Sequence, residues 1–281
     1  MLIAQITDTH IQMPGGSIDA NYRTAEHLAR AVAHLNTLQP QPDVVLHTGD
    51  AVEEGTEAEY GLLRELLSEL SAPVYVIPGN HDHRARMRAA FAGDNYLPEN
   101  GFLHYAIEHW PLRLIGLDTQ VEGASHGELC GERLSWLEHT LDSSPERPTV
   151  IFMHHPPFRS GHTLMDSMGL LEPGPFAEIV KTHSQVRHIL CGHMHQPLVS
   201  SFSGAVTTVS PSTAHQIALD LGPAPGMAVC MENPAVTLLQ WDAEADALVH
   251  YLSYTEGRPR HVVHDGQGWC GSSALPPGFH R

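Results

Sequence analysis

The chain of 281 residues is 42% hydrophobic and 17% charged, a composition typical of globular proteins that excludes a mainly disordered chain. Its formal net charge of -17 repels polyanions, so we expect no nucleic acid polymer among its partners. The first residues hold neither a basic segment nor an apolar run long enough for a signal peptide or a membrane span. We therefore expect a cytoplasmic protein with no membrane partner.

Short apolar runs alternate with helical patterns over most of the chain before residue 204, which predicts a layered α/β fold. Strands are expected at 2–7, 44–48, 74–77, 112–117, 150–153 and 186–191. Apolar residues recur at helical spacing in three further segments, and these predict helices at 25–35, 60–70 and 134–141.

The pattern changes at about residue 204, where strand-like runs follow one another without convincing helices between them. The runs at 205–209, 236–241 and 248–254 predict a second sheet that closes a sandwich. We expect one domain over 1–254, with its second sheet beginning at about residue 204. The tail over 255–281 is rich in Gly and Pro, and is either a loose extension or an arm that contacts another subunit.

Histidine and cysteine usage narrows the kinds of site to expect. Histidine, the commonest metal ligand, occurs 22 times. The four cysteines form no C-x-x-C pair, which fits a reduced compartment and argues against a zinc knuckle or a dithiol motif. They are Cys130, Cys191, Cys230 and Cys270.

Potential metal ligands follow five of the predicted strands. In open α/β sheets, ligands bind outside the carboxyl ends of the strands, so these side chains should meet at one edge. Each short motif is weak alone, because Asp-x-His is frequent by chance and Gly-Asp after a strand is usually a turn. Their convergence is what indicates a metal centre. The residues are Asp8, His10, Asp50, Asn80, His81, His154, His155, His193 and His195.

The order of these motifs resembles that of a known family. Asp-x-His, Gly-Asp, Gly-Asn-His-Asp, His-His-Pro-Pro and Gly-His-Met-His follow one another as in the calcineurin-like metallophosphoesterases. The stretches at 77–82, 151–157 and 191–195 are similar to the bacterial class III cyclic-nucleotide phosphodiesterases, and nearest to their glycerophosphodiesterase branch. The resemblance is clear from Met1 to about Gln216. It implies an α/β fold, a four-layer αββα sandwich of two mixed sheets flanked by helices, with a small cap and a C-terminal oligomerisation arm.

Carried onto this sequence, the resemblance implies two divalent metal ions that share one carboxylate. The implied ligands are Asp8, His10 and His195 for one ion, Asn80, His154 and His193 for the other, and Asp50 for both. A water between the ions would lose its proton near neutral pH, and the resulting hydroxide would attack the phosphodiester. Nitrogen and oxygen ligands without thiolate suit iron, manganese, zinc or cobalt better than calcium. Because an amide oxygen is a weaker ligand than a carboxylate, we expect the ion at Asn80 to bind more loosely.

Other residues are expected at the substrate. The resemblance implies that His81 points at the phosphoryl oxygens or the leaving group, where an imidazolium would donate a hydrogen bond to developing charge. The alternative is a histidine that orients Asp50 or Asn80. Asp50 and His81 are the expected catalytic residues, and Asn80, His81 and His215 the expected substrate-binding residues. For His215, a surface histidine is an equal alternative.

Neighbouring residues have simpler expected roles. His155 is expected to be structural, with its side chain facing away from that of His154 if the strand continues. Arg159 is expected in a solvated loop, with a contact to the substrate as the alternative, and Asp82 in a turn or at a helix cap. The segment 13–22 is expected at the rim of the site, where it would shape substrate access.

Three functions fit this sequence. The first is a phosphodiesterase for cyclic nucleotides, glycerophosphodiesters or related small diesters, acting as a homo-oligomer, either a dimer or an assembly of dimers. The second is a phosphomonoesterase of the same family, although a dianionic monoester usually recruits extra basic donors and no arginine directly accompanies Asn80 and His81. The third is a non-catalytic scaffold with this fold. Such scaffolds typically lose ligands, whereas every expected ligand position is filled here.

Overall fold

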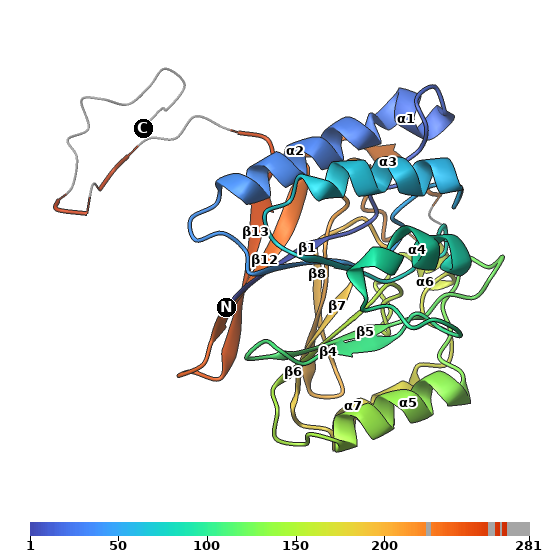
Figure 1. The fold of residues 1–281 in the computed structure, drawn as a ribbon, viewed down its shortest axis with the longest axis vertical. Helices are drawn as coiled ribbons and strands as arrows, with labels where there is room; N and C mark the ends of the chain where they lie inside the picture. The colour runs from blue at the N-terminus through green and yellow to red at the C-terminus, as the bar shows by residue number, and fades with distance from the viewer. Residues whose placement is uncertain (223–225, 258–261, 265, 269–281) are drawn as a thin grey trace.

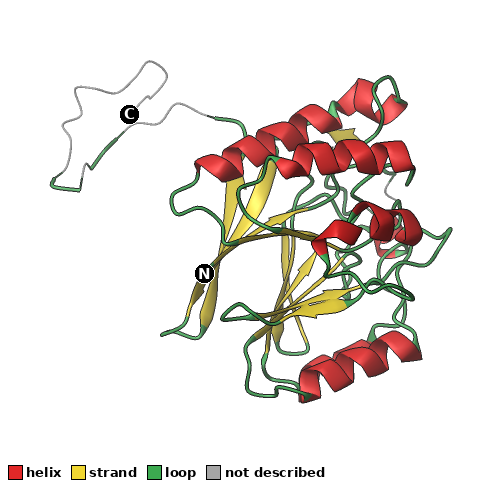
Figure 2. Cartoon of the chain, viewed as in Figure 1, coloured by secondary structure: helices red, strands yellow, loops and turns green. Residues whose placement is uncertain are grey.

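Two β-sheets pack face to face in this computed structural model, with helices on both outer faces (Figures 1 and 2). The structure describes residues 1–222, 226–257, 262–264 and 266–268. The layers run helices, five-stranded sheet, six-stranded sheet, helices, so the predicted four-layer αββα sandwich is confirmed. Within the described ranges, every helix is too short or too polar to cross a membrane.

The five-stranded sheet is built around three parallel strands from the start of the chain. Its order is β13-β12-β1-β2-β3, and β12 runs antiparallel to both β1 and β13. The strands are β1 (Leu2–Ile6), β2 (Val44–His47), β3 (Val74–Val76), β12 (Ala235–Asp242) and β13 (Ala247–Tyr254). The helices on its side are α1 (Ser17–Tyr22), α2 (Thr24–Thr37), α3 (Glu57–Ser68), α4 (Arg84–Ala90) and the 3₁₀ turn Ala92–Asp94.

The six-stranded sheet has a parallel centre and antiparallel edges. Its order is β4-β5-β6-β7-β9-β8. The strands are β4 (Tyr105–Ile107), β5 (Arg113–Leu117), β6 (Thr149–Met153), β7 (Val186–Cys191), β8 (Leu198–Phe202) and β9 (Ala205–Val209). Its outer face carries α5 (Gly131–Asp142) and α7 (Gly174–Thr182). Outside both sheets lie α6 (Thr163–Asp166) and a small hairpin of β10 (Gln216–Ile217) and β11 (Val229–Cys230).

Apolar side chains fill the three spaces between the four layers. Helix α2 buries Leu28, Ala31, Val32 and Leu35, a spacing that places all four on the face toward the first sheet. A second cluster lies between the two sheets, and a third lies beneath α5 and α7. The sheets therefore act as a rigid support for the loops that leave the carboxyl ends of the strands.

The prediction of a separate second sheet beginning at about residue 204 was wrong. Strand β9 joins β7 in a sheet that already begins at β4, and β12 pairs with β1, with Leu2 opposite Gln240. Alternating apolar residues predict a strand but not its partner, and β1 had an open edge at which a later strand could pair.

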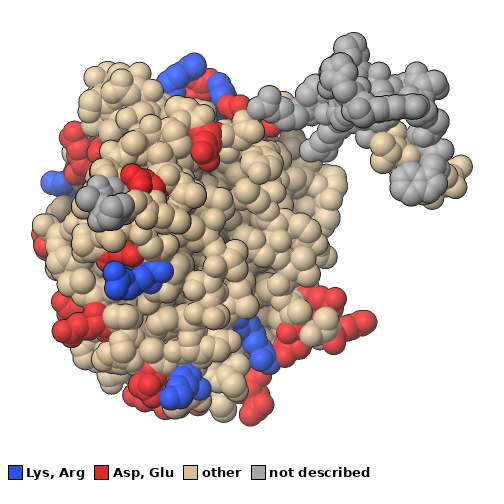
Figure 3. Space-filling model, turned by 180° about the vertical axis from the view of Figure 1, so that it is seen from behind, with Lys and Arg blue, Asp and Glu red and all other residues tan. Residues whose placement is uncertain are grey.

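The predicted C-terminal arm falls largely on residues 258–261, 265 and 269–281, which lie outside the described residues, as does Cys270. The division between a domain over 1–254 and a tail therefore stays a prediction. The other three cysteines are free. On the face drawn in Figure 3, acidic and basic side chains are interspersed without a large basic patch, as the net charge leads one to expect.

Candidate metal centre

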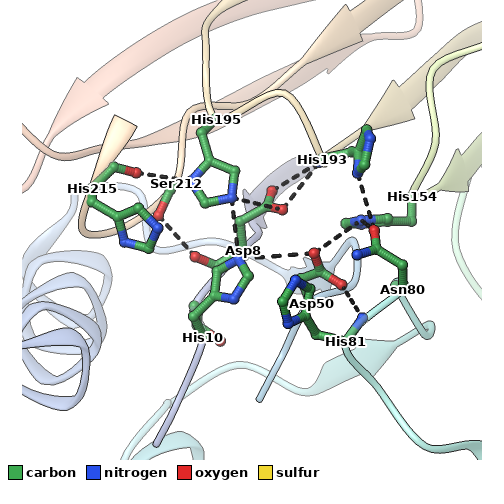
Figure 4. A network of polar contacts seen from close by, with 12 residues as sticks. Asp8, His10, Asp50, Asn80, His81, His154, His193, His195, Ser212 and His215 are labelled. Carbon is green, nitrogen blue, oxygen red and sulfur yellow. Dashed lines mark hydrogen bonds and ion pairs between the residues drawn. The ribbon is translucent and has the colours of Figure 1, made fainter. Parts of the chain in front are cut away.

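The seven predicted ligands lie together where the carboxyl ends of β1, β2, β3, β6 and β7 meet (Figure 4). Six of them are buried, and Asn80 is half-buried at the mouth of the site. The ligands are Asp8, His10, Asp50, Asn80, His154, His193 and His195. The structure therefore brings together residues that are up to 187 positions apart, from Asp8 to His195.

Asp8, His10 and His195 form one half of the centre, which we call the His10 cluster. The Nε2 atoms of His10 and His195 are 3.1 Å apart, and His195 Nε2 lies 3.4 Å from Asp8 Oδ1. The outer nitrogen of each ring, which faces away from the other ring, also has a polar partner. His10 Nδ1 lies 2.7 Å from Glu53 Oε2, and His195 Nδ1 lies 2.9 Å from the carbonyl oxygen of His215.

Asn80, His154 and His193 form the other half, which we call the Asn80 cluster. Asn80 Oδ1 lies 3.2 Å from His154 Nε2 and 3.1 Å from His193 Nδ1. The outer nitrogen of His154, Nδ1, lies 2.8 Å from the carbonyl oxygen of Thr48. This cluster thus repeats the pattern of two imidazoles and one oxygen donor, with a neutral amide in place of the carboxylate.

The carboxylate of Asp50 lies between the two clusters. Its Oδ2 is 3.3 Å from His154 Nε2 and 3.8 Å from His10 Nε2, and its Oδ1 accepts a hydrogen bond of 2.9 Å from the backbone N–H of His81. One carboxylate oxygen therefore faces both halves, which is the geometry that a bridging ligand requires. The role of bridge itself stays a prediction.

The protonation pattern of the imidazoles fits bound cations. A carbonyl oxygen only accepts hydrogen bonds, so the outer nitrogens of His154 and His195 must donate, and in the neutral ring the inner nitrogen then carries a lone pair. The Glu53 carboxylate imposes the same tautomer on His10. With neutral rings, lone pairs at such short separations would repel one another, and a cation between them, either a proton or a metal ion, removes the repulsion. The residues present therefore fit a transition-metal site of nitrogen and oxygen donors.

The field inside the centre also favours positive charge. Burial would raise the pKa of Asp50, yet the neighbouring His154 holds it well below its usual value. Burial would likewise lower the pKa of His154, but Asp50 raises it to about 9. A buried pair of carboxylates, Asp8 and Asp50, thus attracts protons to the rings when no other cation is near.

Backbone strain is concentrated at the same residues. Five of the seven predicted ligands have left-handed φ values between 42° and 72°, which residues other than glycine rarely adopt. They are Asp8, His10, Asp50, His193 and His195. Glycines permit the close approach of the loops, because a Cβ at Gly79 would collide with Asp50 and a Cβ at Gly192 with Thr7.

Glu53 is a contributor that the sequence interpretation missed. Its carboxylate contacts His10 at 2.7 Å and lies 3.5 Å from His81 Nδ1, while its backbone oxygen lies 2.9 Å from the same His81 nitrogen. Burial would raise the pKa of Glu53, but the hydrogen bond from His10 lowers it. The available signal was an acidic residue three positions after Asp50, in a loop that leaves the carboxyl end of a strand.

His81 and His215 lie at the mouth of the centre. The rings of His81 and His10 meet edge to face at 4.8 Å, and the His215 ring lies 4.7 Å from that of His195. His215 is buried and stacks on Tyr22 at 4.6 Å, so it is not a surface histidine. Burial lowers the pKa of His215, and the adjacent His195 lowers it further. Its ring therefore favours the neutral form.

The remaining assignments have mixed outcomes. The expected alternation after His154 does not hold, because β6 ends at Met153, and the His155 ring lies 4.8 Å from those of both His154 and His193. Asp82 accepts a hydrogen bond from Gly79 N, which confirms a turn. Asp82 is not a helix cap, because His83 occupies that position in α4.

Two further contacts concern the loops around the centre. The Oγ1 atom of Thr119, which follows β5, lies 2.8 Å from His155 Nδ1. The loop after β5 supplies none of the predicted ligands, yet it supports the centre through this contact. Arg159 lies in a solvated loop as predicted, with its side chain 85% exposed.

A cavity of about 270 Å³ opens onto the centre. Its polar lining includes Asp50, Glu53, Asn80 and His81, and the rest of its lining includes apolar residues from outside the two sheets. Ile18 and Tyr22 are among these apolar residues, so the predicted rim over 13–22 does border the site. Among the described residues, no lysine or arginine lines the cavity.

Comparison with known proteins points to one family. Residues 1–197 match the family model described as calcineurin-like phosphoesterase. A probable glycerophosphodiester phosphodiesterase, GpdQ, from Arcobacter nitrofigilis is 35% identical over 260 residues, which cover 92% of this chain and 95% of that protein. The 3′,5′-cyclic adenosine monophosphate phosphodiesterase CpdA from Escherichia coli is 32% identical over 214 residues, which cover 76% of each protein.

Solved structures show the same fold at lower identity. A dimetal phosphatase from Danio rerio has a TM-score of 0.66 and 14% identity, over 91% of this chain and 96% of that one. The Plasmodium protein GAP50, described as an anchor in the inner membrane complex, has a TM-score of 0.61 and 11% identity, over 91% of this chain and 85% of that one. At this identity, the likeness supports the architecture alone.

Proposed function

Because the chain belongs to the calcineurin-like phosphoesterase family, we propose that it is a metal-dependent phosphodiesterase that hydrolyses small phosphodiesters. The observation that carries the proposal is the set of inward-facing imidazole nitrogens beside two buried carboxylates, with their outer nitrogens fixed by Glu53, Thr48 and His215. A scaffold without catalysis would have no need of such an arrangement.

We propose two divalent metal ions, drawn from iron, manganese, zinc and cobalt. The His10 cluster would hold one ion, the Asn80 cluster the other, and Asp50 would contact both. Bound there, two cations supply the positive charge that polarises a phosphoryl group and lowers the pKa of the attacking water. Mixed nitrogen and oxygen donors suit these metals without choosing among them.

The protein groups at the mouth would position the substrate. Glu53 O fixes His81 Nδ1 as a donor, so His81 Nε2 is the nitrogen that can reach a phosphoryl or leaving-group oxygen. In the metal-free protein, burial would lower the pKa of His81 but Asp50 and Glu53 raise it, and an imidazolium there would donate such a hydrogen bond. Asn80 and His215 would border the bound diester.

The charge of the cavity favours a diester over a monoester. A phosphodiester carries one negative charge, whereas a monoester carries nearly two at neutral pH and gains from additional cationic donors. No lysine or arginine lines the described part of the cavity. Cyclic nucleotides and glycerophosphodiesters, which the names of the relatives mention, are the proposed substrate classes. We further propose a cytoplasmic homo-oligomer.

The test is hydrolysis of bis(p-nitrophenyl) phosphate against p-nitrophenyl phosphate by chelated protein reconstituted with manganese, zinc, iron or cobalt. We expect metal-dependent turnover that favours the diester. His154→Ala should abolish it, and His139→Ala, on the exposed side of α5, should not. Preference for the monoester would indicate a phosphomonoesterase instead. No turnover with any metal would overturn the proposal and favour the scaffold.

A further inference from the structure

One side of the cavity carries apolar side chains to which the metal chemistry assigns no role. We call these residues the apolar wall: Ile18, Tyr22, Met165, Met168, Ile217, Met227 and Val229. They come from α1, from α6 and the turn after it, and from the β10–β11 hairpin. None of these elements belongs to the sheets that deliver the ligands, so the wall is a separate feature placed against the centre.

The wall offers carbon and sulfur to a ligand and few hydrogen-bonding groups. Ser125 is the only hydroxyl-bearing residue besides Tyr22 among the described residues around the cavity, and the other polar groups belong to the centre or its support. A substituent with several hydroxyls would lose water contacts there without regaining an equal number of partners. An alkyl or aryl substituent would instead bury apolar surface.

Two members of the wall lie open to solvent. Met227 is 57% exposed and Val229 is 40% exposed, beside a polar centre where water would otherwise be favoured. Three of the seven residues are methionines, whose unbranched thioether side chains adapt to irregular apolar ligands. Exposed apolar surface of this kind, continuous with a site that grips phosphate, fits contact with the rest of the substrate.

We propose that the site selects phosphodiesters in which one ester group is apolar, a short alkyl chain or a single aryl ring, and that this group lies against the apolar wall. The inference rests on the proposed phosphodiesterase function and revises its substrate class, because it ranks cyclic nucleotides and glycerophosphodiesters below diesters with an apolar ester group. The cavity of about 270 Å³ has room for a short alkyl chain or a single ring. A dihydroxypropyl group, as in a glycerophosphodiester, would be the poorer partner of the wall.

The first test varies only the group under study. Methyl, ethyl, butyl, phenyl and 2,3-dihydroxypropyl esters of p-nitrophenyl phosphate share one leaving group, so the bond that breaks stays the same. With metal-reconstituted protein, we expect kcat/KM to rise about fourfold for each added methylene that is buried. Butyl and phenyl esters should exceed the dihydroxypropyl ester at least tenfold. Equal kcat/KM values across the series, or the highest value for the dihydroxypropyl ester, would overturn the inference.

The second test measures binding without turnover. Dimethylphosphinate and diphenylphosphinate carry one negative charge and no ester bond, so the enzyme cannot hydrolyse them. Calorimetric titration should show the diphenyl compound binding at least tenfold more tightly. Equal affinities would mean that the wall is covered by something else, such as another segment of this chain or a second copy, and would also contradict the inference.

Substitutions in the apolar wall test whether the selectivity between esters arises there. Met227→Gln and Met168→Gln should each lower kcat/KM for the butyl and phenyl esters several-fold more than for the methyl ester. Met231→Gln is the matched control, because Met231 is 51% exposed just beyond the same hairpin and does not line the cavity. An equal loss on every ester in the wall variants would contradict selection by the wall.

The outcomes separate the inference from the function on which it rests. Turnover of diesters with no dependence on the substituent would leave the phosphodiesterase in place and remove only the selectivity. If no diester were hydrolysed with any metal, the proposed function would fall, and the phosphinate titration would still decide whether the wall binds apolar groups.

Discussion

The His10 cluster and the Asn80 cluster contain similar ligands but differ in charge and in support. The first includes the carboxylate of Asp8, and the outer nitrogens of both its imidazoles have fixed partners. The second has only the amide of Asn80, and among the described residues the buried outer nitrogen of His193, Nε2, has no hydrogen-bond partner. Two similar sets of ligands therefore need not form two equal sites.

The pKa values of the imidazoles report the same asymmetry. Burial and the charge of His154 lower the pKa of His193 to about 3, whereas Asp8 raises the pKa of His195 against the effect of burial. The pKa of His154 in the Asn80 cluster is raised by Asp50, which faces both clusters, so the asymmetry rests on Asp8, the carboxylate that only the His10 cluster contains. We expect that cluster to hold its metal ion more tightly.

Removing the shared carboxylate should have the largest effect. Asp50→Ala removes the group that faces both clusters, so we expect the protein to bind fewer metal equivalents and the phosphodiesterase activity to fall by about a thousandfold or more. Metal content by atomic emission and kcat on bis(p-nitrophenyl) phosphate would measure the change. Undiminished activity would mean that Asp50 does not bridge the clusters.

The matched control for this variant is Asp246→Ala. Asp246 has a left-handed φ of 49°, the same as Asp50, so both substitutions place alanine in the same strained conformation. Asp246 pairs with Arg187 at the surface, far from the cavity lining. A loss shared by both variants would therefore reflect the backbone and not the metal centre.

Loss of the Glu53 carboxylate should have the next largest effect, because Glu53 supports only the His10 cluster. Glu53→Gln keeps the shape but removes the charge that fixes His10 Nδ1 as a donor. We expect a loss of about 10- to 100-fold in affinity for the tighter ion, and little change for the other. Glu54→Gln is the control, because Glu54 contacts Gln12 instead of a predicted ligand. An equal loss of affinity for both ions would contradict the expected difference between the two clusters.

The positions of the predicted ligands could be inferred from the sequence, whereas those of the residues that support them could not. Each predicted ligand follows a strand that its apolar run identifies, and the carboxyl ends of parallel strands meet at one edge. Glu53 and Thr119 act through contacts that depend on the path of a loop, and no local pattern specifies such a path. The ligand roles themselves stay predictions until metal binding is measured.

The sheet partners were also beyond the sequence pattern. The runs that became β12 and β13 predicted strands correctly, but pairing with β1 joins residues more than two hundred positions apart. Alternation shows which face of a strand is buried and leaves its neighbour open. The apolar wall was hidden for a similar reason, because α6 and the β10–β11 hairpin are too short to give a clear periodic signal.

Exchanging the neutral ligand for a charged one should reduce the asymmetry. Asn80→Asp supplies the Asn80 cluster with a carboxylate, and we expect its ion to bind about tenfold more tightly, a gain of about 1.4 kcal/mol. Calorimetric titration of the chelated protein with manganese would separate the two binding steps. Asn95→Asp, at the end of the 3₁₀ turn, is the control. Two equal affinities in the unchanged protein would contradict the asymmetry itself.

The smallest expected effect near neutral pH is on stability, and it comes from a buried imidazole outside the metal centre. This imidazole shows how burial shifts the pKa of a histidine when carboxylates do not oppose the shift. His188 on β7 lies 3.1 Å from Thr208 Oγ1, and its ring faces that of His250. Burial, assisted by the charge of His250, lowers the pKa of His188 from 6.5 to about 4. In contrast to His154, no carboxylate among the described residues reverses the shift.

The folded state therefore excludes a proton that the unfolded chain accepts below pH 6.5. Above that pH His188 is neutral in both states and has no effect. As the pH falls, the free energy of unfolding should decrease by about 1 kcal/mol by pH 6 and by about 3 kcal/mol near pH 4. His188→Gln should flatten this part of the curve, measured by urea unfolding of the metal-free protein between pH 7 and 4. An unchanged slope in the variant would show that other groups cause the loss.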